Sequence, residues 1–334
     1  MTHDADKAPR AGPYVVKKLR ELDHALTEAV PRVLQSSDDE AIHDLRVAIR
    51  RLRTMLKMAR PLYGRWHCDV VRKAFAEVMS ATGDLRDEEV LEETLADVST
   101  SPSFTTWLGA RAARERKLRR NVTLRIERGE LDRARLLLKA LLVFPLEPKK
   151  DVELARFSRR TVERARRAVE KGRDVPVSDV VGLHDLRIAY KELRYSIELL
   201  SEALPLDARA MLEPAAVFQK RLGEIHDVDV ALETVQKARN LPAVAREEAL
   251  AELAAKRDRK IAKYLKELDP IGAATRAKIA ADADAASGAT GGAEAVAEAV
   301  AGGAAEADPD ADAETISIGF EPFPGDPPGT GTAG

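Results

Sequence analysis

The sequence of 334 residues has few aromatic side chains, a single cysteine and no long apolar segment. Phe, Trp and Tyr make up only 4% of the chain, and strand-forming residues are sparse, which disfavours a β-rich fold. Cys68 has no partner for an internal disulfide, a usage typical of the reducing cytoplasm, and it is expected to be a buried small apolar side chain. No run of about 18 apolar residues exists, so no membrane-spanning helix is expected. The opening MTHDADKAPR lacks the apolar core of a signal peptide.

The sequence is rich instead in Ala, Leu, Arg and Glu, a composition that favours helices. Apolar residues recur at helical spacing from Tyr14 onward, and no strand-like alternation occurs before residue 271. These patterns predict an all-α protein, and its short connections favour antiparallel neighbours, as in a helical bundle. Helices are predicted over residues 14–33, 37–61, 66–81, 85–97, 103–127, 131–144, 151–171, 178–203, 207–222, 226–239 and 242–268.

The net charge of −2 conceals two parts of opposite charge. Residues 1–270 contain 52 basic and 45 acidic residues, a net charge of +7, whereas residues 271–334 contain 11 acidic and two basic residues, a net charge of −9. The acidic part is rich in Ala, Gly, Asp and Pro, so it cannot bury enough apolar surface to offset the entropy that ordering would cost. We therefore predict a disordered acidic tail over residues 271–334 and a disordered N-terminus over residues 1–12.

An eleven-residue phrase occurs twice, as HDLRVAIRRLR at residues 43–53 and as HDLRIAYKELR at residues 184–194. A second pair of phrases, GDLRDEEVLEETL from Gly83 and GEIHDVDVALETV from Gly223, has an offset of 140 positions, close to the 141 of the first pair. Two matches at nearly one offset indicate an internal duplication rather than a chance likeness between charged helices. The sequence therefore predicts two pseudo-symmetric antiparallel four-helix bundles, over residues 13–147 and 148–270.

Each copy of the HDLR phrase has a cationic side and an apolar side when it is drawn as a helix with about 100° per residue. In the first copy, Leu45, Ile49 and Leu52 lie opposite the basic residues. Like charges at these spacings repel one another, so the pattern indicates that something anionic lies against each cationic stripe. The two stripes consist of His43, Arg46, Arg50, Arg53 and Lys57 in the first copy, and of His184, Arg187, Lys191 and Arg194 in the second.

Further basic residues are candidates for the same surface. Arg156 and Arg160 lie on one side of the helix predicted over residues 151–171, and the counterpart of this helix in the first copy contributes Lys17. The planar fork of Arg can hold two phosphate oxygens, Lys supplies a mobile point charge, and a His beside an anion favours its charged form. Two bundles packed with their stripes face to face would line a central basic groove, which suits a linear polyanion better than a single phosphate.

These phrases resemble the CHAD family, the α-helical domain named for its histidines. The likeness is carried by HDLRVAIRRLR, by LHDLRIAYKELRYSIELL and by the two glycine-led phrases, and it covers most of residues 14–268. It implies two pseudo-symmetric four-helix bundles around a basic pocket for inorganic polyphosphate, and an association with bacterial polyphosphate granules. It also implies that the first four residues of each stripe bind the polymer. The chain departs from the family pattern at Glu192, where a basic residue is common, and at His226, where Asn is common.

Two other functions stay open at this point. Adjacent His-Asp pairs begin at His43, His184 and His226, and such pairs hold metal in some phosphohydrolases, although the surrounding arginines would oppose a divalent cation. A nucleic acid would share the attraction to a basic groove, but the scattered aromatic residues offer no stacking platform for bases. We expect a cytoplasmic, granule-associated polyphosphate-binding protein without cofactor, metal or catalytic residues. Its acidic tail would contact other granule-associated proteins.

Overall fold

The computed structural model describes residues 8–35, 40–143 and 151–268 of the chain. Within these ranges the protein is built almost entirely of α-helices, which confirms the predicted fold class. A short 3₁₀ helix, η1, follows the seventh α-helix. The elements are α1 (Ala11–Gln35), α2 (Ala41–Tyr63), α3 (Arg65–Leu95), α4 (Pro102–Glu127), α5 (Glu130–Val143), α6 (Leu154–Gly172), α7 (Val180–Leu200), η1 (Ser201–Ala203), α8 (Leu206–Ala210), α9 (Leu212–Lys237) and α10 (Ala243–Leu268).

Several sequence predictions concern the edges of these ranges. The predicted acidic tail over residues 271–334 and the predicted boundary at residues 147 and 148 lie outside the described residues. Disorder is predicted through residue 12, whereas α1 begins at Ala11, whose backbone N–H donates to the carbonyl oxygen of Val152 at 2.9 Å. Among the helices of the described ranges, none is long and apolar enough to cross a membrane.

The apolar side of each HDLR phrase lies in the core. Leu45, Ile49 and Leu52 of α2 are completely buried, and Leu186 and Ile197 of α7 are at most 1% exposed. Burying a side chain of this size contributes about 1.5–3 kcal/mol to folding. The 3.6-residue period thus correctly predicts which side of each helix packs inward, and it leaves the basic residues on the other sides.

Two predicted helix breaks are wrong. The sequence places interruptions around Gly83 and Gly223, but α3 and α9 run through these positions without a break. A glycine inside a helix costs about 1 kcal/mol relative to alanine. This cost is smaller than the gain from burying apolar neighbours such as Leu85 and Ile225, which are each 1% exposed.

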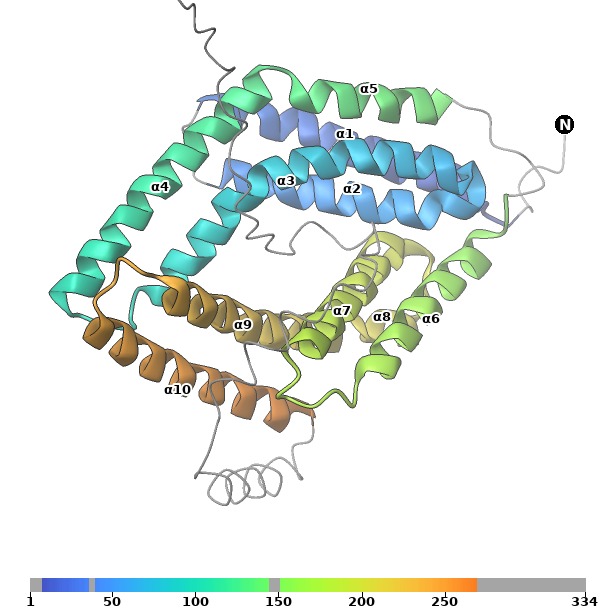
Figure 1. Cartoon of the computed structure of the whole chain (residues 1–334). Coiled ribbons are helices and arrows are strands. Elements are labelled where there is room, and N and C mark those ends of the chain that lie inside the picture. The colour runs from blue at the N-terminus through green and yellow to red at the C-terminus, as the bar shows by residue number, and fades with distance from the viewer. Residues whose placement is uncertain (1–7, 36–39, 144–150, 269–334) are drawn as a thin grey trace, which may run out of the picture.

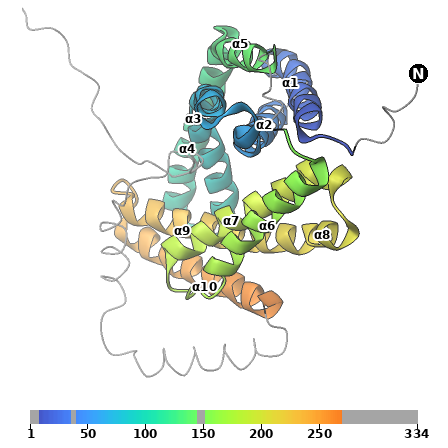
Figure 2. The ribbon, with the colours of Figure 1, turned by 90° about the vertical axis from the view of Figure 1, so that its right-hand side faces the viewer.

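The helices form two groups that touch along several elements. In the first group, α1, α2, α3 and α5 run side by side, and in the second α7 lies against both α6 and α9 (Figure 1). The second group lies below the first when the molecule is turned by 90° (Figure 2). The groups meet where α2 contacts α7, where α3 contacts α9 and where α1 contacts α6.

A separate apolar core joins the two halves of the chain. The C-terminal end of α3 and the start of α4 extend beyond the first group and meet the end of α9 and the start of α10 (Figure 1). The length of α3, 31 residues against 23 for the neighbouring α2, allows this extension. The sequence predicts two bundles in chain order and does not anticipate this shared core. Its buried members are Leu91, Leu95, Val98, Phe104, Trp107, Val228, Ala231, Val235, Ala238, Leu241, Ala245, Ala249 and Leu253.

Candidate functional site

The helices that carry the two HDLR phrases, α2 and α7, contact each other. Two ion pairs cross this contact: Lys57 Nζ lies 3.1 Å from Glu192 Oε2, and Arg51 Nη2 lies 3.4 Å from Glu198 Oε2. In both pairs the base belongs to α2 and the acid belongs to α7. The α2–α7 contact is therefore held by residues of opposite charge, although both predicted stripes are basic.

A small cavity of about 40 Å³ lies among α2, α3 and α7, and we call it the α2–α7 cavity. Three basic residues of its lining are almost completely buried, because Arg53 is 3% exposed, Lys191 is 5% exposed and Arg72 is 6% exposed. A cavity of this volume has room for about one water molecule. Residues from both stripes therefore line one small cavity that is partly open to solvent. The lining consists of Arg53, Thr54, Lys57, Arg72, Ile188, Lys191, Glu192 and Tyr195.

The charge of this lining favours an anion. It contains four basic side chains and one carboxylate. Lys57 pairs with Glu192, while Arg72 donates from Nε to the carbonyl oxygen of Arg53 at 3.2 Å and lies 3.4 Å from the carboxylate of Asp69. Charges held away from bulk water interact more strongly than charges at the surface, so positive groups gathered here attract an added anion strongly.

Tyr195 contacts one arginine from each stripe. Arg50 Nη1 donates to the hydroxyl oxygen of Tyr195 at 3.2 Å. The guanidinium carbon of Arg194 lies 5.5 Å from the centre of the Tyr195 ring, a cation–π distance. This tyrosine therefore orients two predicted binding residues. The sequence does not predict this role, because a single tyrosine beside an arginine has no distinctive spacing.

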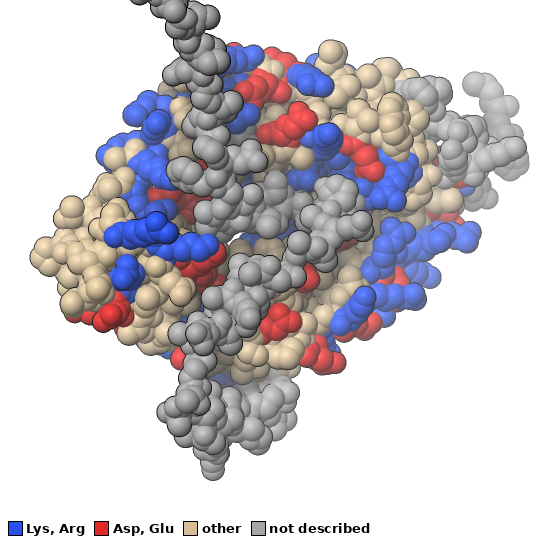
Figure 3. Space-filling model, viewed as in Figure 1, with Lys and Arg blue, Asp and Glu red and all other residues tan. Residues whose placement is uncertain are grey.

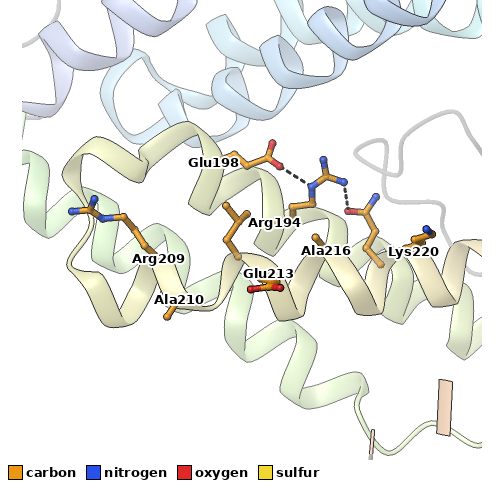
Figure 4. Close-up of a pocket in the computed structure, with 9 residues that line it drawn as sticks. Arg194, Glu198, Arg209, Ala210, Glu213, Ala216 and Lys220 are labelled. Atoms are coloured by element: carbon orange, nitrogen blue, oxygen red, sulfur yellow. Dashed lines mark hydrogen bonds and ion pairs between the residues drawn. The ribbon is translucent and has the colours of Figure 1, made fainter. Parts of the chain in front are cut away.

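Arg194 also lines a larger and more open cavity of about 750 Å³ between α7, α8 and α9 (Figure 4). Its Nε donates to Glu198 Oε1 at 2.7 Å, and its Nη1 donates to Gln219 Oε1 at 3.3 Å (Figure 4). Because Glu198 also pairs with Arg51 of α2, this α7–α9 cavity adjoins the α2–α7 contact. The lining consists of Arg194, Glu198, Arg209, Ala210, Leu212, Glu213, Ala216, Gln219 and Lys220.

Arg46 points to a different neighbour from the one expected. The residue is 3% exposed, and its Nη1 donates to Thr82 Oγ1 at 2.6 Å and to the carbonyl oxygen of Met79 at 3.3 Å. Both acceptors belong to α3. The guanidinium of Arg46 therefore ties α2 to α3 inside the protein, in addition to any part it has in ligand binding.

The second HDLR histidine lies beside a histidine of the second glycine-led phrase. Nδ1 of His184 and Nδ1 of His226 are 3.4 Å apart, and the ring centres are 4.6 Å apart. In such a contact one ring nitrogen donates a hydrogen bond and the other accepts it. The departure from the family pattern at His226 thus places a second titratable ring next to a predicted binding residue. His43, in contrast, is exposed at the start of α2.

Three predicted binding residues belong to helices other than α2 and α7. Arg156 and Arg160 are exposed on α6, where basic side chains follow the right-hand edge of the molecule (Figure 3). Lys17 is exposed on α1, with its Nζ 3.7 Å from Glu21 and 3.8 Å from Glu202. None of the three lines the α2–α7 cavity or the α7–α9 cavity. In the other direction, Arg51, Arg72, Arg209 and Lys220 lie at the site without having been identified from the sequence.

Two acids near these histidines pair with arginines of other helices. Asp44, in the first turn of α2, accepts a hydrogen bond from Arg32 at 2.6 Å. Farther along α9, Asp229 lies 2.5 Å from Arg257; burial raises the pKa of the Asp229 carboxyl, and Arg257 opposes that rise. Within the described ranges, no group of three or more His, Cys, Asp or Glu side chains is arranged to hold a metal ion.

Two solved structures have a similar fold. The crystal structure of the CHAD domain from the plant Ricinus communis matches with a TM-score of 0.63 and 22% sequence identity, over 80% of this chain and 94% of that chain. PptA from Streptomyces chartreusis matches with a TM-score of 0.60 and 15% identity, over 78% of this chain and 99% of that chain. At these identities the likeness concerns the fold. A comparison with curated proteins finds no match.

A family comparison adds the sequence evidence. The CHAD domain matches residues 19–236, which is more than half of the chain. This span contains both HDLR phrases and both glycine-led phrases. The chain therefore belongs to the CHAD domain family.

Proposed function

We propose that this protein binds inorganic polyphosphate where α2 and α7 meet. One observation carries the proposal: basic residues of both HDLR phrases, Arg53 and Lys57 from α2 and Lys191 from α7, line the same cavity. Membership of the CHAD family supports the same ligand, because the family is associated with polyphosphate.

The chemistry of the surface suits a chain of phosphates. Arginine forks can hold two phosphate oxygens, and lysines add mobile positive charge. The α7–α9 cavity continues the basic surface through Arg194, Arg209 and Lys220. A long polymer can contact both cavities at once, whereas orthophosphate can contact only one, so the affinity should rise with chain length.

The decisive experiment is a titration of labelled polyphosphate at several salt concentrations. The site variant carries Arg50→Gln, Lys57→Gln and Lys191→Gln, which removes three positive charges at the α2–α7 contact. Each phosphate contact contributes about 0.7 units of log K per tenfold change in salt, so the variant should bind roughly 100-fold more weakly at 0.1 M salt. Its salt dependence should also be shallower. Circular dichroism and thermal unfolding check that the variant is folded.

A matched control removes the same charge from the outer face of α6. Arg159, Arg164 and Lys171 are exposed there, and replacing all three with Gln should leave the affinity within about threefold of wild type. An equal loss of affinity in both triple variants would show non-specific electrostatic attraction and would contradict the proposed site. A separate variant, Arg156→Gln with Arg160→Gln, tests the two α6 arginines that the sequence places with the stripes. A loss of affinity in that variant would extend the binding surface onto α6.

The alternatives predict different outcomes of simple assays. A binding protein leaves the polymer length unchanged in the presence of Mg²⁺ or Mn²⁺, whereas a metal-dependent phosphohydrolase shortens the polymer and releases phosphate. If the protein binds nucleic acids, duplex or single-stranded DNA at an equal concentration of phosphate should displace the bound polyphosphate. We expect neither phosphate release nor effective competition at 0.15 M salt.

The same proposal includes a cellular location. If the protein binds polyphosphate in the cytoplasm, it should accumulate on polyphosphate granules. The acidic segment over residues 271–334 would then be available to granule-associated proteins. A fluorescent fusion should form foci in cells that make polyphosphate and be diffuse in cells that do not. Foci in both kinds of cell would contradict this part of the proposal.

A further inference from the structure

We propose that Glu192 and Glu198 serve as internal counter-anions of the basic surface between α2 and α7, and that a bound polyanion replaces them. Glu192 pairs with Lys57 across the α2–α7 contact. Glu198 bridges two basic residues, because its Oε2 lies 3.4 Å from Arg51 and its Oε1 accepts from Arg194 at 2.7 Å. The inference rests on the proposed function and identifies which residues regulate the affinity of the same site.

The positions of these pairs in the two copies give the first argument. Glu192 follows Arg51 by 141 residues, and Glu198 follows Lys57 by 141 residues. Each ion pair therefore joins the same two positions of the helices that carry the duplicated phrase, with a base on α2 and an acid on α7. If both copies carried bases at these positions, like charges would face each other across the contact and the helices would repel. The two glutamates convert that repulsion into attraction.

The size of the α2–α7 cavity gives the second argument. The cavity has a volume of only about 40 Å³, and Glu192 forms part of its lining. Its carboxylate therefore holds the contact with Lys57 that a phosphate group would need. The side chains of Lys57 and Glu192 are each 33% exposed, which leaves both of them free to turn toward solvent. Displacement of the Glu192 carboxylate would widen the cavity at its edge and leave the Lys57 ammonium available to a phosphate group.

The chemistry of the exchange gives the third argument. A partly exposed ion pair is weak, and a phosphate group offers an arginine or lysine the same oxygen contacts as the carboxylate that it replaces. A polymer supplies many such groups at once, so it can displace both glutamates together. The released carboxylates then recover their hydration and their own counter-ions, which reduces the net release of ions on binding.

The test is a polyphosphate titration of the double variant Glu192→Gln and Glu198→Gln. Without the internal anions, the affinity at 0.1 M salt should rise about 3- to 30-fold, and the salt dependence should become steeper. The control is Glu163→Gln with Glu170→Gln. It removes two negative charges from α6, where both glutamates pair with Arg166. The control variant should bind within about twofold of wild type.

Each outcome separates the inference from the proposed function. If wild type does not bind polyphosphate, the proposed function fails first. If wild type binds and the double variant binds equally or more weakly, the glutamates are not displaced and the inference is wrong. Equal gains in the double variant and in the α6 control would show a general effect of net charge and would also overturn it. The single variants, each of which keeps one ion pair across the contact, repeat the test if the double variant does not fold.

Discussion

Substitution of Arg46 tests whether this residue supports the fold or binds the ligand. The sequence places it in the same stripe as Arg50, yet it is 3% exposed and donates hydrogen bonds to Thr82 and to the carbonyl oxygen of Met79. We predict that Arg46→Met reduces the stability of the fold and changes polyphosphate binding by less than about threefold. Arg50→Met should change the stability little and weaken polyphosphate binding, because Arg50 is only partly buried and donates a hydrogen bond to Tyr195 at the site.

The size of the effect follows from the contacts. Methionine keeps most of the buried aliphatic stem of Arg46, so the loss of packing is small. The substitution removes two hydrogen bonds from a charged donor, each of which contributes about 1.5–3 kcal/mol. Thr82 still donates its hydroxyl to the carbonyl oxygen of Met79 at 2.9 Å, so that carbonyl keeps a partner. The variant also avoids burying a guanidinium, which offsets part of the loss. The net free energy of unfolding should fall by about 2–4 kcal/mol.

Urea unfolding followed by circular dichroism measures this change, with polyphosphate titration of the same samples in parallel. The m-value should stay constant, which would show that the folded and unfolded states are otherwise comparable. A loss of less than about 1 kcal/mol together with a tenfold weaker affinity would refute the reasoning, because it would show that Arg46 turns toward the ligand in solution.

Two further predictions concern residues away from the site. Cys68 is completely buried, and burial raises the pKa of its thiol to about 12. A thiol reagent at pH 8 should therefore label Cys68 only after the protein unfolds. Rapid labelling of the native protein would contradict this burial. A hydrogen bond from Lys256 lowers the pKa of Asp97, so the stabilisation is present above the ordinary carboxyl pKa of about 3.9 and is lost as the pH falls through the lower folded value. Asp97→Asn should therefore lower the free energy of unfolding by at most about 0.5–1 kcal/mol at pH 7 and by progressively less below pH 4. Thermal unfolding over this pH range checks it, and a loss independent of pH would be inconsistent with the ion pair.

The sequence predicts the helices and their buried sides well because both depend on local periodicity. Leu45, Ile49 and Leu52 recur at intervals of three and four residues, and all three are completely buried. The errors around Gly83 and Gly223 have the opposite origin. A glycine signals a break by its local preference alone, whereas the continuous helices are decided by the apolar contacts on either side of it.

The candidate site is harder to predict because periodicity gives a direction around one helix but not the neighbour in that direction. Arg46 and Arg53 share a stripe, yet Arg46 binds acceptors on α3 and Arg53 lines the α2–α7 cavity. Arg156 is likewise predicted from its direction around α6, but that side of α6 is exposed to solvent. Arg72 could not be predicted because only tertiary packing brings α3 to the site, and Tyr195 could not because a single tyrosine beside an arginine has no distinctive spacing.

Arginines at matching positions of the two HDLR phrases have different surroundings in the structure. Arg46 and Arg187 occupy the same place in the two HDLR phrases. The hydroxyl of Thr82, directly before the first glycine-led phrase, accepts from Arg46. The residue directly before the second phrase is Leu222, which is 2% exposed and whose side chain has no hydrogen-bonding group. Arg187 accordingly remains more exposed than Arg46, with its Nε beside Gly223, where a Cβ atom would lie 3.6 Å away. Arg46 therefore joins α2 to α3, whereas Arg187 has no threonine at the matching position and is more exposed to solvent, where a polyanion can reach it.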